Sequence, residues 1–184
     1  MKKYKLSGII SVAVMGLALM NFASCSEKKF KVNGTITQAK DSILYLENMS
    51  LSGPRTVDSV KLDESGNFEF SYKAAPAPEF YRLRIANQIV NIGVDSTETI
   101  NVKAAYPTMS ANYEVSGSEE CAKIRELAYM QLALQNKVTA IANSNSLGVA
   151  AVEDSVAKVL DVYKNKVKMD YIFKEPMKAY AYYA

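Results

Sequence analysis

The chain has 184 residues, and its 22 lysines and arginines against 19 acidic residues give a formal net charge of +3. Lys2, Lys3 and Lys5 fall in an N-terminal export segment, so the rest of the chain balances at 19 basic and 19 acidic residues. A balanced chain lacks the basic field on which nucleic-acid binding depends. The sequence contains no histidine, which excludes imidazole general bases and histidine-ligated zinc or haem.

The first 24 residues have the three parts of a signal peptide. Lysines precede an apolar run from Leu6 to Met20, and the small residues Ala23 and Ser24 stand immediately before Cys25. The alternative is an uncleaved membrane helix, but spanning needs about 20 uninterrupted apolar residues. Polar or small residues dilute this run at Ser7, Gly8, Ser11 and Asn21. The sequence therefore predicts a lipoprotein signal at residues 1–24.

Cys25 is the predicted lipidation site, and residues 25–29 form the lipidated cysteine and a short polar tether. Two or more acyl chains give stable anchoring. No acidic cluster that would mark surface export follows Cys25, so we expect attachment to the cell envelope at the periplasmic face of the outer membrane. With Cys25 acylated, Cys121 is the one remaining thiol. The mature chain then has no CxxC motif and no intramolecular disulfide.

Residues 30–116 have the pattern of a β domain. Thr56 to Leu62 alternates apolar with polar residues, and the turn sequence from Asp63 to Asn67 joins it to Phe68–Tyr72 as a hairpin. About eight short strands are separated by turn residues at regular spacing. This predicts a mainly β fold followed by α, with an antiparallel β-sandwich or open barrel.

Residues 117–175 have helical periodicity. Hydroxyls and carboxylates in Ser116–Glu120 suit a helix start. Apolar residues then recur at helical spacing up to Ile141, and again from Val149 to Val167. The polar break at 143–146 between them predicts an αα-hairpin arm. Residues 176–184 begin a further helix after Pro176, so we expect a truncated segment there.

Several segments in this order resemble a known family. They read FKVNGTI, LYLENM, VDSVKLDESGNFEF, PEFYRLRI, IGVDSTETINVKA and YEVSGSEE. Together they resemble the N-terminal domain of unknown function of Gram-negative thioredoxin-like (TlpA-like) thiol-disulfide lipoproteins, a peroxiredoxin-related group. The resemblance implies a lipid anchor, a β-sandwich and a following thioredoxin domain with a CxxC motif. That domain is absent from this sequence, so no catalytic residue is carried over.

Cys121 is open to two interpretations. At the first turn of a helix, the dipole would lower the pKa of the thiol and favour reactivity. Glu119 and Glu120 oppose this effect, and Cys121 aligns with Ile124 and Ala128 on the apolar stripe. We therefore predict a small buried side chain rather than a functional thiol.

Carboxylates and aromatic residues give weaker signals. A glycosidase pair or calcium loop is one interpretation of the acidic residues, and solvated turns are the favoured one; these residues are Asp58, Asp63, Glu64, Asp95 and Glu98. The strand aromatics either pack in the core or line a sugar or peptide groove; they are Tyr45, Phe68, Phe70, Tyr72, Phe80 and Tyr81. Tyr180, Tyr182 and Tyr183 either form a recognition patch or pack against a following domain.

These observations predict a membrane-anchored, non-catalytic interaction and positioning module of a cell-envelope thiol-disulfide lipoprotein. Its partners would be the membrane, through the lipid anchor, and a protein partner or a downstream thioredoxin-like domain. No catalytic residue, cofactor or metal ligand is predicted. The alternative is a free-standing lipoprotein that binds a glycan or peptide on its sandwich. A weaker third hypothesis is a hydrolase that uses Asp95 and Glu98.

Overall fold

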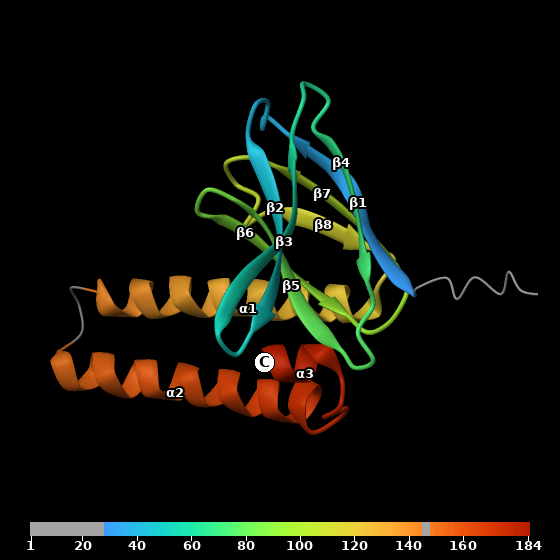
Figure 1. Cartoon of the computed structure of the whole chain (residues 1–184). Helices are drawn as coiled ribbons and strands as arrows, with labels where there is room; N and C mark the ends of the chain where they lie inside the picture. Colours follow the sequence, from blue (N-terminus) through green and yellow to red (C-terminus); the bar gives the residue numbers. More distant parts are fainter. Residues whose placement is uncertain (1–27, 145–147) are drawn as a thin grey trace, which may run out of the picture.

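A computed structural model describes residues 28–144 and 148–184 of the chain (Figure 1). The β region contains eight strands, which are β1 (Lys29–Thr37), β2 (Ile43–Ser50), β3 (Gly53–Lys61), β4 (Asn67–Lys73), β5 (Glu79–Ile85), β6 (Gln88–Val94), β7 (Thr99–Ala105) and β8 (Tyr113–Ser116). The helical elements that follow are α1 (Glu119–Ala142), α2 (Val149–Val167), the π-helical turn η1 (Lys168–Ile172) and α3 (Ala179–Tyr183). The prediction of a mainly β fold followed by α is confirmed.

The strands form two four-stranded sheets that pack as a sandwich. One sheet has the order β4-β1-β7-β8 and is called the β1 sheet here; the other has the order β3-β2-β5-β6 and is called the β2 sheet. Strands pair antiparallel except for β1 and β7, which run parallel. The two separate sheets confirm the sandwich of the two predicted alternatives, and the parallel pair is an exception to the antiparallel pairing that we expected.

The core lies between the sheets and follows the alternation of each strand. Phe30 and Val32 of β1 belong to the same core cluster as Leu44 and Leu46 of β2, and all four side chains are fully buried. In β5, Tyr81, Leu83 and Ile85 are buried, so the residues between them lie on the opposite face. One face of the β2 sheet therefore makes the core, and its other face is open to the helices.

The close approach of β1 and β7 requires glycine at one position. Gly34 is paired with Val102, and a Cβ atom at Gly34 would lie 1.8 Å from the Val102 carbonyl oxygen. Its φ of +152° is also unfavourable for residues with a side chain. Gly34 therefore permits the parallel pair that completes the β1 sheet.

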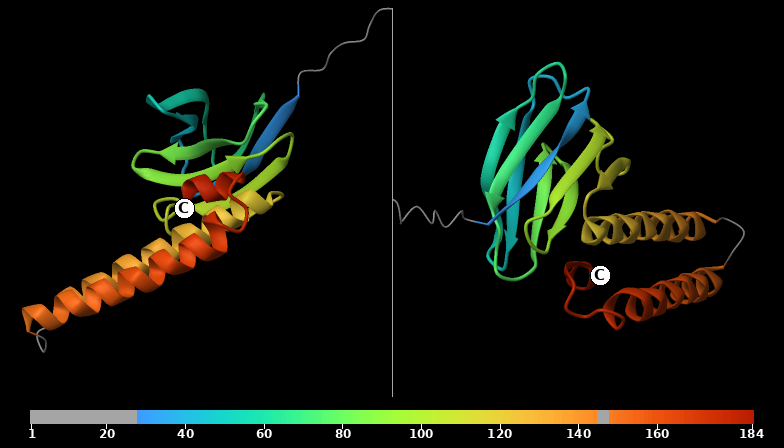
Figure 2. Two further views of the ribbon diagram at one scale, coloured as in Figure 1. Left: turned by 90° about the horizontal axis from the view of Figure 1, so that it is seen from below. Right: turned by 90° about the vertical axis from the view of Figure 1, so that its right-hand side faces the viewer.

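The helices form an arm whose base packs on one edge strand of each sheet. α1 contacts β6 and β8, and α2 returns alongside α1, which confirms the predicted αα-hairpin. The outer halves of both helices project beyond the sandwich (Figures 1 and 2). Ile124 and Leu127 near the base are buried, whereas Leu134, Val138 and Ile141 further out are half-buried. Two helices alone cannot enclose a core, so the apolar stripe predicted from the sequence is fully buried only at the base.

Candidate functional site

The predicted lipidation site cannot be placed in the structure. Cys25 and the signal peptide at residues 1–24 lie outside the described residues. Within residues 28–144 and 148–184, no helix has the length and apolar character needed to cross a bilayer. The acylation of Cys25 therefore stays a prediction from the sequence.

Cys121 is buried at the base of α1, as expected. Its side chain is 1% exposed, and its Sγ–H donates to the Gly93 carbonyl oxygen at 3.2 Å. Burial raises the pKa of the Cys121 thiol to about 12, against a smaller lowering effect of the Ser118 hydroxyl. The helix-dipole effect is therefore outweighed by desolvation, and the thiol is protonated at neutral pH.

The candidate carboxylates serve turns and surface pairs. Asp63 accepts hydrogen bonds from the Ser65 and Gly66 amides and from the Ser65 hydroxyl, which lowers the pKa of Asp63. Glu98 accepts from the Asp95 amide, while burial raises the pKa of Glu98. Among the described residues, no three acidic or cysteine side chains come close enough to hold a metal ion. The geometry gives no support to a calcium loop.

The C-terminal tyrosine segment docks on its own chain. Tyr180 is 3% exposed and packs with Ile124, Leu127 and Tyr171, although we expected this segment to pack against a following domain. The reason is a long-range contact: the Tyr180 amide donates to Oε2 of the buried Glu120 at 3.0 Å. Tyr182 remains 66% exposed. The expectation is therefore wrong for Tyr180.

The Lys178 ammonium group adds an ion pair to this contact. Lys178 Nζ lies 3.4 Å from Glu120 Oε1 and 3.8 Å from Asp95 Oδ2. The Glu120 carboxylate raises the pKa of Lys178. Glu120 thus stabilises the start of α1 locally and also holds the start of α3. The sequence signal for Glu120 was only that of an acidic helix start.

Gly93 lets the arm approach the sheet closely. It lies on the outer face of β6, where a Cβ atom would be 2.7 Å from Ile124 Cδ1 and 3.1 Å from the Ala179 Cβ. α1 and α3 therefore meet β6 at a position where only glycine fits without displacement. Sequence analysis did not identify Gly93, because a single glycine in a strand has several explanations.

Arg125 fixes α1 to β8. Its Nε donates to the Tyr113 carbonyl oxygen at 2.6 Å, and its guanidinium lies 4.7 Å from the Tyr129 ring centroid. The Tyr129 hydroxyl and the Tyr113 amide are 3.2 Å apart in a further hydrogen bond. A cation held over an aromatic face and bonded to a carbonyl restrains the angle at which the arm leaves the sandwich.

A buried ion network ties β2 to β5 on the outer face of the β2 sheet. Glu47 is 4% exposed and accepts from Arg82 Nε at 2.6 Å and from Arg84 Nε and Nη2 at 2.9 and 2.8 Å. The Arg84 hydrogen bond is the main cause of the lowered pKa of Glu47. Arg84 also covers the Tyr45 ring at 4.5 Å. The alternation of arginines with apolar residues in β5 carried this signal, but we did not assign a role to it.

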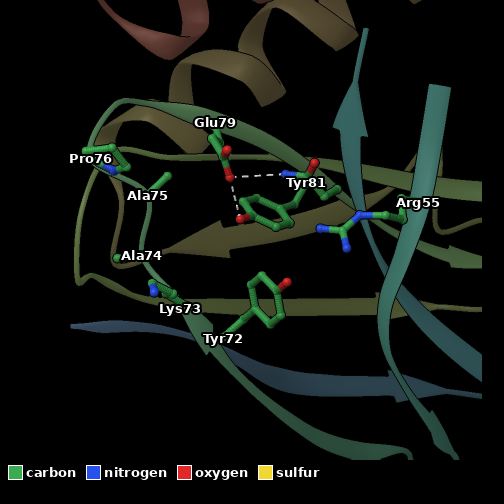
Figure 3. Close-up of a pocket in the computed structure, with 9 residues that line it drawn as sticks. Arg55, Tyr72, Lys73, Ala74, Ala75, Pro76, Glu79 and Tyr81 are labelled. Atoms are coloured by element: carbon green, nitrogen blue, oxygen red, sulfur yellow. Dashed lines mark hydrogen bonds between the residues drawn. The ribbon is translucent and has the colours of Figure 1, made fainter. Parts of the chain in front are cut away.

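A small cavity with several polar side chains in its wall lies where β3, β4 and β5 come together at one end of the sandwich. Its volume is about 210 Å³, and Figure 3 shows Glu79, Tyr81, Tyr72 and Arg55 around it. Tyr72 and Tyr81 were aromatic candidates for a groove, and the structure brings both to this cavity. Phe68 and Phe70 pack in the core, as favoured, and Phe80 lies beside Tyr183 instead.

Two solved structures show a distant likeness to this chain. (S)-allantoin synthase is 9% identical with a TM-score of 0.35 over 51% of this chain and 45% of that one. A candidate cell adhesion protein from Bacteroides ovatus is 11% identical with a TM-score of 0.28 over 50% and 43%. This chain thus spans less than half the length of either protein. No curated protein sequence matches it.

One protein family matches the sandwich and the base of the arm. Residues 30–123 match the family described as domain of unknown function (DUF4369). The match extends from β1 into the first turn of α1, so it includes the cavity residues, the Glu47 network and Cys121. The chain therefore belongs to the DUF4369 family.

Proposed function

We propose that this protein is a membrane-anchored, non-catalytic module that holds a protein partner or a following thioredoxin-like domain at a fixed position on the cell envelope. The observation that carries the proposal is the docking of α3 on the sandwich through Glu120, Tyr180 and Gly93. The first turn of α3 is hydrogen-bonded to α1. A following segment or a protein partner that contacts the exposed Tyr182 would therefore be held at a defined position relative to the sandwich.

The arrangement of the ends supports this function. The first described residues enter β1 on one side of the molecule, and the C-terminal end of α1 and the N-terminal end of α2 lie on the opposite side (Figures 1 and 2). An anchor at Cys25 would put the sandwich near the bilayer and direct the hairpin away from it. The 24 residues of α1 correspond to about 36 Å of reach at 1.5 Å per residue.

The anchor is tested by metabolic labelling with radioactive palmitate in a Gram-negative host. We expect the full chain to incorporate label and to fractionate with the outer membrane, protected from external protease. Cys25→Ala should lose the label, whereas Cys121→Ala, the matched cysteine control, should keep it. Label that persists in Cys25→Ala, or its absence from the unmodified chain, would refute acylation at Cys25.

The positioning role is tested by the distance between the sandwich and α3. Spin labels at Thr99→Cys and Tyr182→Cys, in a full chain with Cys25→Ala and Cys121→Ala, should give one narrow distance distribution. Glu120→Gln should broaden it, because the amide of Tyr180 loses a charged acceptor worth about 1.5–3 kcal/mol. The exposed neighbour Glu119→Gln is the control and should leave the distribution narrow.

Two results would contradict the positioning role. A broad distribution in the unmodified background would mean that α3 is not held, and equal broadening by both glutamine variants would remove Glu120 from the explanation. The non-catalytic part has its own test, because the chain should not reduce insulin disulfides. Turnover that survives Cys121→Ala would refute it.

A further inference from the structure

The cavity at the end of the sandwich contains a carboxylate that is held in place on one side. Glu79 Oε2 accepts from the Tyr81 hydroxyl at 2.7 Å and from Asn48 Nδ2 at 3.1 Å (Figure 3). Tyr81 is 1% exposed, and burial together with Glu79 raises the pKa of its hydroxyl, so it remains a donor. Two donors on one oxygen restrain the position of the Glu79 carboxylate.

The second oxygen of Glu79 has no protein donor. Within residues 28–144 and 148–184, every side-chain hydrogen bond of Glu79 is made by Oε2. Glu79 thus lines the cavity with a fixed carboxylate that has spare capacity to accept, and such a carboxylate is suited to a cation that brings its own hydrogens. An alkylammonium supplies three such donors.

A cation lies on another wall of the same cavity. Arg55 reaches from β3 toward the two tyrosines in Figure 3 and also lines the cavity. In the part of the chain that the structure describes, Arg55 makes no ion pair and the Tyr72 hydroxyl makes no hydrogen bond. The guanidinium and Glu79 share a cavity of about 210 Å³ and yet do not pair with each other within 4.0 Å. The cavity thus holds opposite charges separated by space.

We propose that this cavity binds a small zwitterion, namely a free amino acid or a dipeptide. Its ammonium group donates to the Glu79 carboxylate, its carboxylate accepts from the Arg55 guanidinium and the Tyr72 hydroxyl, and its side chain lies against Ala75 and Pro76. The bidentate fork of arginine suits a carboxylate.

The size of the cavity supports this class of ligand. A volume of 210 Å³ is that of about seven water molecules at about 30 Å³ each. Sites for larger organic ligands run from about 300 Å³ upward, which disfavours an oligosaccharide. The site does not depend on the anchor or on the docking of α3, so it can fail or succeed independently of the proposed function.

The test is equilibrium dialysis of the full chain in detergent micelles against radiolabelled alanine and, separately, alanyl-alanine. We expect saturable binding of one of them. The comparison shows which distance between ammonium and carboxylate matches the distance between Glu79 and Arg55. Capping either charge, as N-acetyl or as carboxamide, should weaken that binding at least about tenfold, since a charged hydrogen bond is lost.

Two variants each remove one of the charged groups proposed to bind the ligand. Arg55→Gln and Glu79→Gln should each weaken binding of the uncapped ligand at least about tenfold. Glu79→Gln should also abolish the penalty for N-acetylation, because the partner of the ammonium is already gone. Lys61→Gln, which removes an exposed cation from the same strand as Arg55, should bind normally. Melting temperatures of the variants exclude unfolding as the cause.

Three results would overturn the proposal. The first is no binding of either ligand at about 10 mM, which is weaker than two charged contacts should give. The second is unchanged binding in Arg55→Gln and Glu79→Gln. The third is equal binding of the capped ligands, which would assign any uptake to apolar contact alone.

Discussion

Replacing Gly93 by alanine tests whether the close approach of β6 to the helices holds the arm in place. The new methyl group would lie 2.7 Å from Ile124 Cδ1, 3.1 Å from Ala179 Cβ and 3.5 Å from Glu120 Cβ. The Ile124 side chain can rotate away, but the Ala179 Cβ moves only with its backbone. We therefore expect α3 to be displaced while the sandwich core between the sheets stays intact.

The magnitude follows from overpacking. One inserted methyl group in a well-packed site costs about 1–3 kcal/mol. If the strain is released by undocking α3, the opening equilibrium of α3 shifts by the same amount, which is about 5- to 150-fold. The reporter is the Tyr180 amide, which donates to Glu120 in the docked state.

The assay is hydrogen exchange monitored by mass spectrometry, together with urea unfolding. Peptides covering α3 should exchange faster in Gly93→Ala, whereas β1 peptides should keep their protection. Gly148→Ala is the matched control, because nothing lies within 4 Å of the added Cβ, and it should change stability by less than about 1 kcal/mol. Unchanged exchange of α3 in Gly93→Ala, or equal effects of both variants, would refute the reasoning.

Three further predictions concern the sandwich and its thiol. Glu47→Gln should lower the free energy of unfolding by about 2–4 kcal/mol in urea, because two arginines lose a buried partner, while the exposed Glu69→Gln should cost less than about 1 kcal/mol. The pKa of Glu47 is lower in the folded chain than its ordinary 4.5, so the advantage of the unmodified chain is complete above that pH and disappears as the pH falls through the lowered value. In a Cys25→Ala background, Cys121 should react with a thiol reagent at least about 100-fold more slowly in the folded chain than in urea, because its thiol is buried and protonated; equal rates would contradict the buried position. Gly34→Ala should cost more than about 3 kcal/mol, since both backbones would have to separate, and soluble protein with unchanged urea midpoint would contradict this.

The sandwich could be predicted from the sequence because its strands and turns have local patterns of apolar alternation and turn residues. Phe68 to Tyr72 alternates in both sequence and burial, and Asp63 forms the turn that its neighbours suggested. Local alternation does not determine which strands become neighbours. The parallel pairing of β1 with β7 joins Val32 to Ile100, 68 positions apart, and no local sequence pattern in either strand predicts that pairing.

Only two of the four main cavity residues were predicted from the sequence. Tyr72 and Tyr81 were candidates because aromatic residues attract attention, but Glu79 and Arg55 looked like ordinary surface charges in their strands. Arg55 and Glu79 come together because β2 lies between their strands, with Asn48 paired to Arg55 on one side and to Tyr81 on the other, while Tyr72 comes from the other sheet. That relation is a property of the assembled sandwich.

Glu120 shows why the end of the chain was misjudged. From the sequence it is one of two adjacent carboxylates at a helix start, and both satisfy the local rule equally. In the fold, Glu119 is exposed, whereas Glu120 turns toward β6 and accepts the amide of a residue 60 positions later. Tyr180 therefore had a partner in its own chain that local periodicity could not reveal. The contrast between Glu119→Gln and Glu120→Gln is consequently the sharpest test of whether this protein holds its C-terminal segment in place.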